Sequence, residues 1–172
     1  MLAAGHGTRM KSTLPKVLHP VLGKPLVLHA LSAVENVVDI PPVVVIGHGA
    51  EDVKAAIQAG VKQDVQFAIQ EKQLGTGHAV MCAQSLLQGK SEKVIITFAD
   101  MPLLTQASIE HIIQLQQESQ SVMVITTVMS EEPRGFGRVI RDSDGSVQAI
   151  VEEVDCTPEQ LLVREKNTSA YC

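Results

Sequence analysis

A continuous run of β-branched residues, Val43 to Ile46, most constrains how this 172-residue chain can fold. Because every side chain in the run is apolar, it predicts a strand buried on both faces, as in a parallel sheet covered by helices. A second strand is predicted over 65–69, and a helix over 51–59 separates the two. Strands that alternate with helices of this length indicate βαβ units. We therefore predict an α/β fold: a Rossmann-like, mostly parallel sheet with helices on both faces.

The composition restricts the classes of partner. The hydrophobic content of 45% suffices for one domain with a sizeable core. A net charge of -5, with one Tyr and three Phe, offers neither a basic surface nor a stacking platform, so we expect no nucleic-acid partner. The sequence shows neither a bilayer-spanning apolar run nor a signal segment, so we expect no membrane partner and a cytoplasmic location. Three cysteines without metal-ligand spacing predict free thiols.

The start of the sequence combines small residues with positive charge. Gly5 and Gly7 follow an apolar segment, and Thr8, Arg9 and Lys16 come after them. Without Cβ atoms, the backbone N–H groups of the two glycines can approach an anion closely, and Arg9 and Lys16 would supply the counter-charge. A flexible basic surface loop is the alternative, because a lone Gly-x-Gly often has no ligand. The longer motif around the glycines favours a phosphate-binding loop.

A second glycine-rich segment, 70–78, follows the predicted strand over 65–69 and leads into a helix predicted over 79–87. In parallel sheets of this kind, ligands bind outside the carboxyl ends of the strands. Gly75 and Gly77 would let a ligand lie against the backbone beside a helix N-terminus. The alternative is an ordinary glycine-rich connection. His78 is interpreted as a helix residue with a capping or packing role.

Asp100 follows a third predicted strand, the apolar run over 93–99, and precedes a proline turn. A carboxylate at this edge of the sheet could anchor Mg²⁺, which keeps most of its ligand positions for water and phosphate. Asp100 could instead cap the helix that begins near Thr105, but Thr105 or Ser108 lies closer to that start. We predict that Asp100 is the metal ligand and that Mg²⁺ is the cofactor.

The motif L-A-A-G-x-G-T-R-M, followed by P-K-V-L-H and Gly23-Lys24-Pro25, resembles the signature of the sugar-nucleotide pyrophosphorylases. It is most similar to the uridylyltransferase half of the bifunctional bacterial enzymes that make UDP-N-acetylglucosamine. The resemblance implies the nucleotide-diphospho-sugar transferase fold. It also implies transfer of UMP from UTP to N-acetylglucosamine-1-phosphate, which gives UDP-N-acetylglucosamine and pyrophosphate for peptidoglycan and lipopolysaccharide precursors.

The resemblance further implies which residues form the site. Arg9 and Lys16 would be catalytic, and Asp100 would bind the metal. The remaining residues would bind substrate, with uracil recognition assigned to Gln70, Gly75 and Thr76, and N-acetylglucosamine recognition to Gly137, Glu152 and Asn167. The full substrate-binding set is Leu2, Ala3, Ala4, Gly5, Gly7, Thr8, Gln70, Gln73, Gly75, Thr76, Phe98, Ala99, Gly137, Glu152 and Asn167.

Several positions depart from the family pattern or allow another interpretation. Phe98-Ala99 stands where the family commonly has Tyr-Gly, and Lys166 and Ser169 stand where it has an apolar residue and glycine. Gly137 could equally be a bulge or turn glycine. Glu152 and Glu153 adjoin, so strand alternation predicts that at most one faces the ligand.

We interpret residues 1–172 as one nucleotidyltransferase domain, incomplete at the C-terminus and also at the N-terminus. The sequence contains no hexapeptide repeat, so it includes no acetyltransferase β-helix domain, and a homotrimer is expected only if the parent protein carries one. Two other functions stay open. One is a different sugar-1-phosphate nucleotidyltransferase, and the other is a non-catalytic nucleotide-sugar-binding module.

Overall fold

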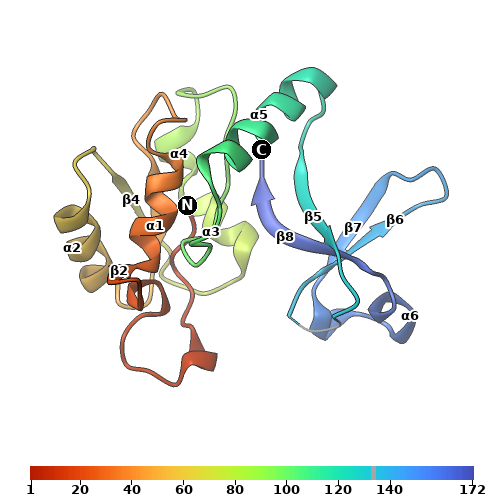
Figure 1. Cartoon of the computed structure of the whole chain (residues 1–172), viewed down its shortest axis with the longest axis horizontal. Helices are drawn as coiled ribbons and strands as arrows, with labels where there is room; N and C mark the ends of the chain where they lie inside the picture. The colour runs from red at the N-terminus through yellow and green to blue at the C-terminus, as the bar shows by residue number, and fades with distance from the viewer. Residues whose placement is uncertain (133–134) are drawn as a thin grey trace.

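The computed structural model describes residues 1–132 and 135–172, apart from the side chain of Arg9 (Figure 1). Its helices and strands are β1 Pro20–Val21, β2 Lys24–Pro25, α1 Leu26–Val34, β3 Val43–Ile46, α2 Ala50–Gly60, β4 Gln66–Ile69, α3 Thr76–Cys82, α4 Gln84–Leu87, α5 Gln106–Ser119, β5 Ile125–Met129, β6 Arg138–Arg141, β7 Val147–Val151, α6 Pro158–Leu161 and β8 Glu165–Tyr171, with 3-10 turns η1 Thr8–Met10, η2 Lys16–Leu18 and η3 Glu153–Asp155.

A parallel arrangement forms the first half of the molecule. β3 and β4 pair in parallel, and Leu2 forms parallel bridges to Val45 on one side and to Phe98 on the other. The backbone N–H of Ala3 donates to the Val45 carbonyl at 2.8 Å, and that of Leu2 donates to the Thr97 carbonyl at 2.8 Å. The start of the chain therefore occupies the central position of the sheet.

Two segments of this sheet pair only through isolated bridges. Residues 1–4 make backbone hydrogen bonds to both neighbours, but among them only Leu2 forms bridges. The apolar run over 93–99 was predicted as a strand, but within it only Ile96 and Phe98 form bridges, each isolated. Phe98 pairs with Leu2 and Ile96 pairs with Tyr171, so the segment connects two parts of the sheet without forming a regular ladder.

Helices cover both faces of the parallel sheet, as predicted. Val44 and Ile46 of β3 belong to a core with apolar side chains of α1, α2 and α5. Val43 and Val45 point to the opposite face, because side chains alternate along a strand, and belong to a second core with Ala79 of α3. All residues of β3 are buried.

The helix boundaries largely follow the sequence signals. α5 begins after Thr105, whose hydroxyl accepts a hydrogen bond from the Ser108 backbone N–H at 3.2 Å, so Thr105 is the N-cap. The helix predicted over 79–87 begins earlier, at Thr76, and is divided into α3 and α4 at Ala83.

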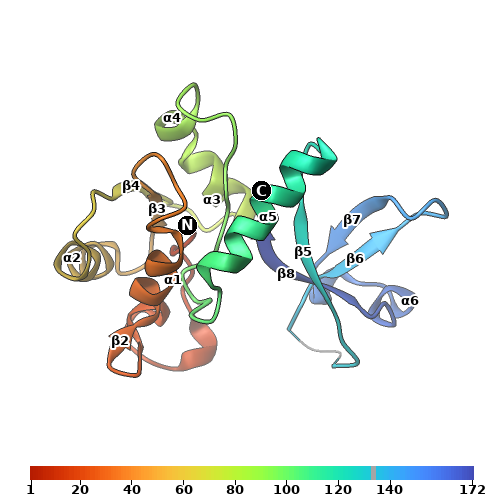
Figure 2. The ribbon, with the colours of Figure 1, turned by 45° about the horizontal axis from the view of Figure 1, so that its top comes forward.

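The second half of the molecule is an antiparallel sheet with strand order β5-β8-β6-β7. An antiparallel bridge between Ile96 and Tyr171 connects it to the parallel half. β8 runs from Glu165 to Tyr171 and pairs with β5 from Ile125 to Met129. In both ribbon views α5 lies between the two halves (Figures 1 and 2).

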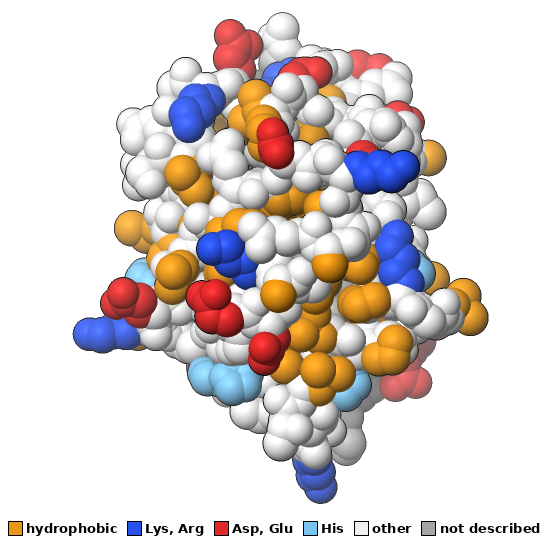
Figure 3. All heavy atoms as spheres, turned by 90° about the vertical axis from the view of Figure 1, so that its left-hand side faces the viewer, with side chains coloured by type: hydrophobic (Ala, Val, Ile, Leu, Met, Phe, Trp, Pro, Cys, Tyr) orange, Lys and Arg blue, Asp and Glu red, His pale blue; other side chains and the backbone are white. Residues whose placement is uncertain are grey.

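The surface carries mixed charge. On the face that includes α2, acidic and basic side chains are scattered among apolar ones (Figure 3). Within the described part of the chain, we find no helix of the length and apolarity needed to cross a membrane.

Candidate nucleotide-binding site

A cavity of about 580 Å³ opens where the central segment, β4 and the 96–98 segment end. It is lined by Leu2, Ala3, Ala4, Gly5, Gly7, Thr8, Met10, Lys16, Val17, Gln70, Gln73, Gly75, Thr76, Ala79, Phe98 and Asp100. These residues come from three segments that are far apart in the sequence, and each segment follows an extended stretch. The cavity therefore lies at the edge of the sheet where ligands of α/β proteins bind.

The loop over 5–7 forms one wall of this cavity. Gly7 has φ +60°, and a Cβ added to it would lie 2.6 Å from Cβ of Lys16. Glycine is required here for two reasons, since the backbone is left-handed and the space beside it is filled by Lys16. η1 follows at once, so the loop turns sharply between the central segment and Lys16.

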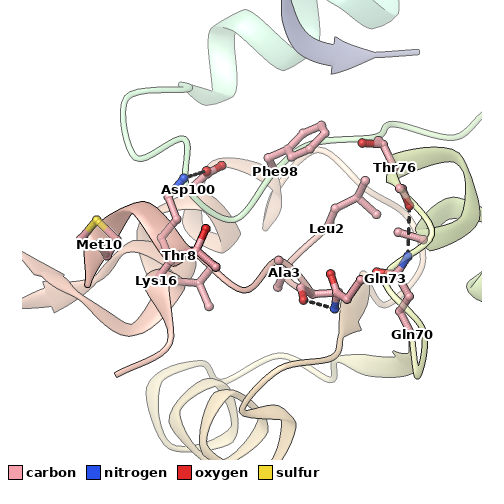
Figure 4. A pocket seen from close by; sticks show the side chains of 16 residues that line it. Leu2, Ala3, Thr8, Met10, Lys16, Gln70, Gln73, Thr76, Phe98 and Asp100 are labelled. Atoms are coloured by element: carbon pink, nitrogen blue, oxygen red, sulfur yellow. Dashed lines mark hydrogen bonds and ion pairs between the residues drawn. The ribbon is translucent and has the colours of Figure 1, made fainter. Parts of the chain in front are cut away.

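Lys16 and Asp100 meet at one end of the cavity. Nζ of Lys16 lies 2.5 Å from Oδ2 of Asp100, and both side chains remain partly exposed (Figure 4). The pair places an ammonium group and a hard carboxylate oxygen beside the glycine loop. An exposed pair of this kind contributes little to stability, so its geometry is more relevant to ligand charge than to folding.

A buried amide lies at the other end of the cavity, where Figure 4 shows Gln70 beside Thr76. Gln70 is only 3% exposed. Its Nε2 donates to the carbonyl of Gly75 at 3.0 Å and contacts Nδ1 of His78 at 3.1 Å. Gly75 has φ +94°, which orients its carbonyl toward Gln70 at the start of α3.

Gln73 connects the two loops that border the cavity. Its Nε2 donates to the carbonyl of Ala4 at 2.5 Å. The same amide group would lie 2.8 Å from a Cβ placed on Gly47, so a larger residue after β3 would displace it. Gln73 thus holds the 70–76 segment against the central segment.

The residues assigned to the sugar gather outside this cavity. The backbone N–H of Asn167 donates to the Gly137 carbonyl at 2.9 Å, and a Cβ on Gly137 would lie 3.6 Å from Oε1 of Glu152. Asn167 is buried, and its side-chain amide donates to the Tyr171 hydroxyl at 2.7 Å. The structure brings these three residues together, but none of them lines the cavity that holds the other predicted residues.

Residues 1–151 match the model of the MobA-like NTP transferase domain. The chain belongs to this family. The chain is 45% identical over 172 residues to the bifunctional protein GlmU of Enterococcus faecalis, and 45% identical over 174 residues to that of Clostridium novyi. In each case all of this chain is covered, and it spans 37% of the relative's length. It is thus a nucleotidyltransferase domain homologous to part of GlmU.

Solved structures show the same fold at lower identity. A UDP-glucose pyrophosphorylase complexed with UDP-glucose has a TM-score of 0.69 and 20% identity, covering 99% of this chain and 73% of its own. The 4-diphosphocytidyl-2C-methyl-D-erythritol synthase of Anaerococcus prevotii has a TM-score of 0.64 and 21% identity, covering 99% of this chain and 66% of its own. These likenesses show that the MobA-like NTP transferase has the nucleotidyltransferase α/β fold.

Three predicted residues of this NTP transferase are placed differently from the rest. Ala99 is fully buried within the core that includes α1 and α5, so its methyl group packs inward and does not line the cavity. Arg9 lies in η1, and its side chain is outside the described residues. β7 ends at Val151, and Glu152 and Glu153 lie at the start of the 3-10 turn η3. The alternation of side chains along a strand therefore does not apply to these two residues. Glu153 accepts a hydrogen bond from the Gly135 backbone N–H at 2.8 Å.

Some lining residues were not predicted. Met10, Val17 and Ala79 add apolar surface to the cavity. Met10 lies within the quoted motif, but its side chain carries no chemical signal of binding. The hydrogen bond between Gln70 and His78 was also not predicted, because His78 was interpreted as a helix residue with a capping or packing role.

The described residues hold no group of three or more His, Cys, Asp or Glu side chains arranged for a metal. A single carboxylate suits only an ion that takes its remaining ligands from phosphate and water. Cys82, Cys156 and Cys172 are free, as predicted.

Proposed function

We propose that this domain transfers UMP from UTP to N-acetylglucosamine-1-phosphate, releasing pyrophosphate. The observation that carries the proposal is the distribution of groups along one cavity. A lysine, a carboxylate and a glycine loop lie at one end, and a buried glutamine amide lies at the other (Figure 4). Such a cavity matches a ligand with phosphates at one end and a hydrogen-bonding base at the other.

The reaction requires no covalent bond between the substrate and the protein. A phosphate oxygen of the sugar-1-phosphate attacks the α-phosphorus of UTP in line, and pyrophosphate leaves from the opposite side. Neither the attacking phosphate nor the leaving pyrophosphate needs a strong general base or acid near neutral pH. Catalysis then rests on orientation and on stabilising charge at phosphorus.

The chain's own groups can supply that stabilisation. We assign Lys16 to the phosphate oxygens, together with Arg9, whose role is implied by the family resemblance. The backbone N–H groups of the 5–7 loop would bind the neighbouring phosphates. Lys16 would exchange its contact with Asp100 for a contact with phosphate when the nucleotide enters. We assign Asp100 to Mg²⁺, which would neutralise charge at the phosphates when bound.

The acceptor sugar is assigned to the neighbouring group of Gly137, Glu152 and Asn167. A carboxylate and an amide can bind sugar hydroxyls, although Asn167 already donates to Tyr171. The product would serve peptidoglycan and lipopolysaccharide precursor synthesis in the cytoplasm. The homology to part of GlmU supports this assignment, and trimerisation would depend on a β-helix domain in the parent protein.

A thermal melt of the 172-residue chain tests the proposal. At a ligand concentration of about 100 times Kd, binding to the folded state adds about 2.7 kcal/mol. For a domain of this size that corresponds to a rise in Tm of roughly 5–10 °C. With Mg²⁺ present, we expect this rise with UTP and UDP-N-acetylglucosamine, and a much smaller one with CTP or GTP.

The other results of this melt would change the assignment. A selective rise with GTP or CTP would indicate a different nucleotidyltransferase. A cooperative melt that no nucleotide shifts would contradict nucleotide binding altogether. Uridylyl transfer itself is checked by release of pyrophosphate from UTP and N-acetylglucosamine-1-phosphate, with Asp100→Asn as the matched inactive control.

A further inference from the structure

We propose that His78 is a positioning residue that orients the Gln70 amide, so that only the carbonyl oxygen of Gln70 faces the nucleotide. In this arrangement the site favours uracil, whose ring nitrogen N3 donates a hydrogen bond. It disfavours cytosine, whose N3 cannot donate one. The inference rests on the proposed function, because it concerns how the same cavity distinguishes UTP from CTP.

The contact with Gly75 determines which end of the amide points away from the cavity. Gly75 presents a backbone carbonyl, 3.0 Å from the side-chain amide of Gln70. A carbonyl oxygen can only accept, so the atom of Gln70 beside it must be the nitrogen, Nε2. This argument assigns the amide orientation from chemistry.

His78 uses the second hydrogen of the same nitrogen. Nδ1 of His78 lies 3.1 Å from Nε2 of Gln70. Because Nε2 has only hydrogens to offer, Nδ1 must accept, and the neutral imidazole therefore carries its proton on Nε2. The thiol of Cys82 lies 4.0 Å from the same Nδ1 and is at most a weak donor to it.

Both hydrogens of the Gln70 amide then form hydrogen bonds, and only its oxygen is available to a ligand. Gln70 is 3% exposed yet lines the cavity, so its exposed surface faces that space. Among the described residues, Oε1 of Gln70 has no hydrogen-bond partner, whereas Nε2 has two. The amide thus presents a lone acceptor to a ligand.

A lone acceptor distinguishes the two pyrimidines. N3 of uracil carries a hydrogen and can donate to Oε1, whereas N3 of cytosine is itself an acceptor and would face Oε1 unpaired. Sites built to pair with one polar group reject an analogue that leaves that group unpaired. If Nδ1 no longer accepts, one hydrogen of the amide loses its partner and only Gly75 opposes rotation of the amide.

Equilibrium binding tests the role of His78. The Kd values of UTP and CTP, each with Mg²⁺, would be measured by calorimetry on the 172-residue chain and on three variants. His78→Leu removes the acceptor. His78→Asn places a carbonyl oxygen near the position of Nδ1, and Cys82→Ala removes only the other neighbour of Nδ1.

We expect His78→Leu to reduce the preference for UTP over CTP by about tenfold, the value of one ordinary hydrogen bond. His78→Asn should restore most of the preference, and Cys82→Ala should retain it. A His78→Leu protein that keeps the full preference would overturn the role of His78 while leaving the proposed function intact. A wild-type chain that binds CTP as tightly as UTP would overturn both.

An independent measurement needs no ligand. Nitrogen NMR of the imidazole distinguishes the two neutral tautomers of His78. We expect the proton on Nε2 at neutral pH. A proton on Nδ1 would contradict the arrangement, because two donors would then face each other. Loss of folding in His78→Leu would not rescue the proposal, since the tautomer of the wild-type chain tests it separately.

Discussion

The cavity and the antiparallel sheet differ in how exposed their charged side chains are. In the cavity, Lys16 is half-exposed and pairs with the carboxylate of Asp100. In the sheet, Arg138 of β6 and Lys166 of β8 are register partners, and both cations are buried. Lys166 is 2% exposed and donates to the carbonyl of Val163. The cavity therefore keeps its charges available, while the sheet encloses two of like sign.

The backbone shows a similar contrast. Gly7, in the cavity wall, adopts a left-handed conformation that glycine tolerates, whereas Ser169, inside β8, has φ +65° with a side chain present. The cavity uses glycine where its geometry needs it. The sheet contains a serine with left-handed backbone and a buried lysine. We infer that sheet positions can be improved by substitution, whereas cavity positions cannot.

The largest expected effect is at Asp100, the proposed metal ligand. Asp100→Asn keeps the size of the side chain but removes its charge, so it should reduce uridylyl transfer by about 10²-fold or more. The melting temperature without ligand should hardly change, because the Lys16 pair is partly exposed. Steady-state kinetics and a thermal melt measure the two effects, and near-normal turnover would remove Asp100 from the mechanism.

A second comparison tests the cavity wall. Gly7→Ala should destabilise the chain by about 1–2 kcal/mol, because the left-handed backbone disfavours a Cβ, and should weaken UTP binding by displacing Lys16. Gly5→Ala is the matched control for stability, since its φ is not positive and no described atom lies within 4 Å of the added Cβ. Denaturant unfolding of the two variants provides the measurement, and equal losses of stability would contradict the argument.

In the sheet, Lys166→Met should increase stability by about 1 kcal/mol at neutral pH, because a buried charge is replaced by an apolar side chain of similar length. Burial, and then the nearby Arg138 charge, lower the pKa of Lys166. The unfolded chain therefore binds more protons between the lowered pKa and the ordinary value near 10.5, and wild-type stability should rise with pH across that interval. The free energy of unfolding of Lys166→Met, measured by denaturant titration, should not rise with pH in this interval. A rise as large as that of the wild type would show that other groups cause it.

The smallest effect is expected at the strained serine. Ser169→Gly should stabilise the chain by about 0.5–1 kcal/mol, because relief of left-handed strain exceeds the added freedom of the unfolded chain. Ser169→Ala keeps the Cβ and should give no gain. The denaturant midpoints of the two variants measure these effects. A higher midpoint in both variants would show that the hydroxyl, and not the backbone conformation, is unfavourable.

The parallel half could be predicted from the sequence because its signals are local. The run Val43 to Ile46 indicates a doubly buried strand by itself, and Thr105 marks the start of α5 by its position before an apolar periodicity. The loop over 5–7 and Asp100 follow extended stretches, so their meeting at one sheet edge follows from the topology. What remained uncertain was the extent of each pairing.

The position of β8 in the antiparallel half could not be derived in the same way. β8 contains Lys, Asn, Thr and Ser, which are not typical of a buried strand, and its place between β5 and β6 depends on pairings distant in sequence. Similarly, the contact between Gln70 and His78 depends on where α3 begins. The helix begins at Thr76, earlier than the sequence periodicity indicated. Local patterns carry no information on such contacts.

The central position of Leu2 also has a kinetic consequence. Leu2 precedes both of its neighbours, Val45 and Phe98, by long stretches of chain, and closing such loops is entropically costly. The 5–7 loop directly follows this segment, so it acquires its final shape only after both distant pairings have closed. Nucleotide affinity should therefore be among the last properties to appear during refolding, well after α1 and α2 have formed their local contacts.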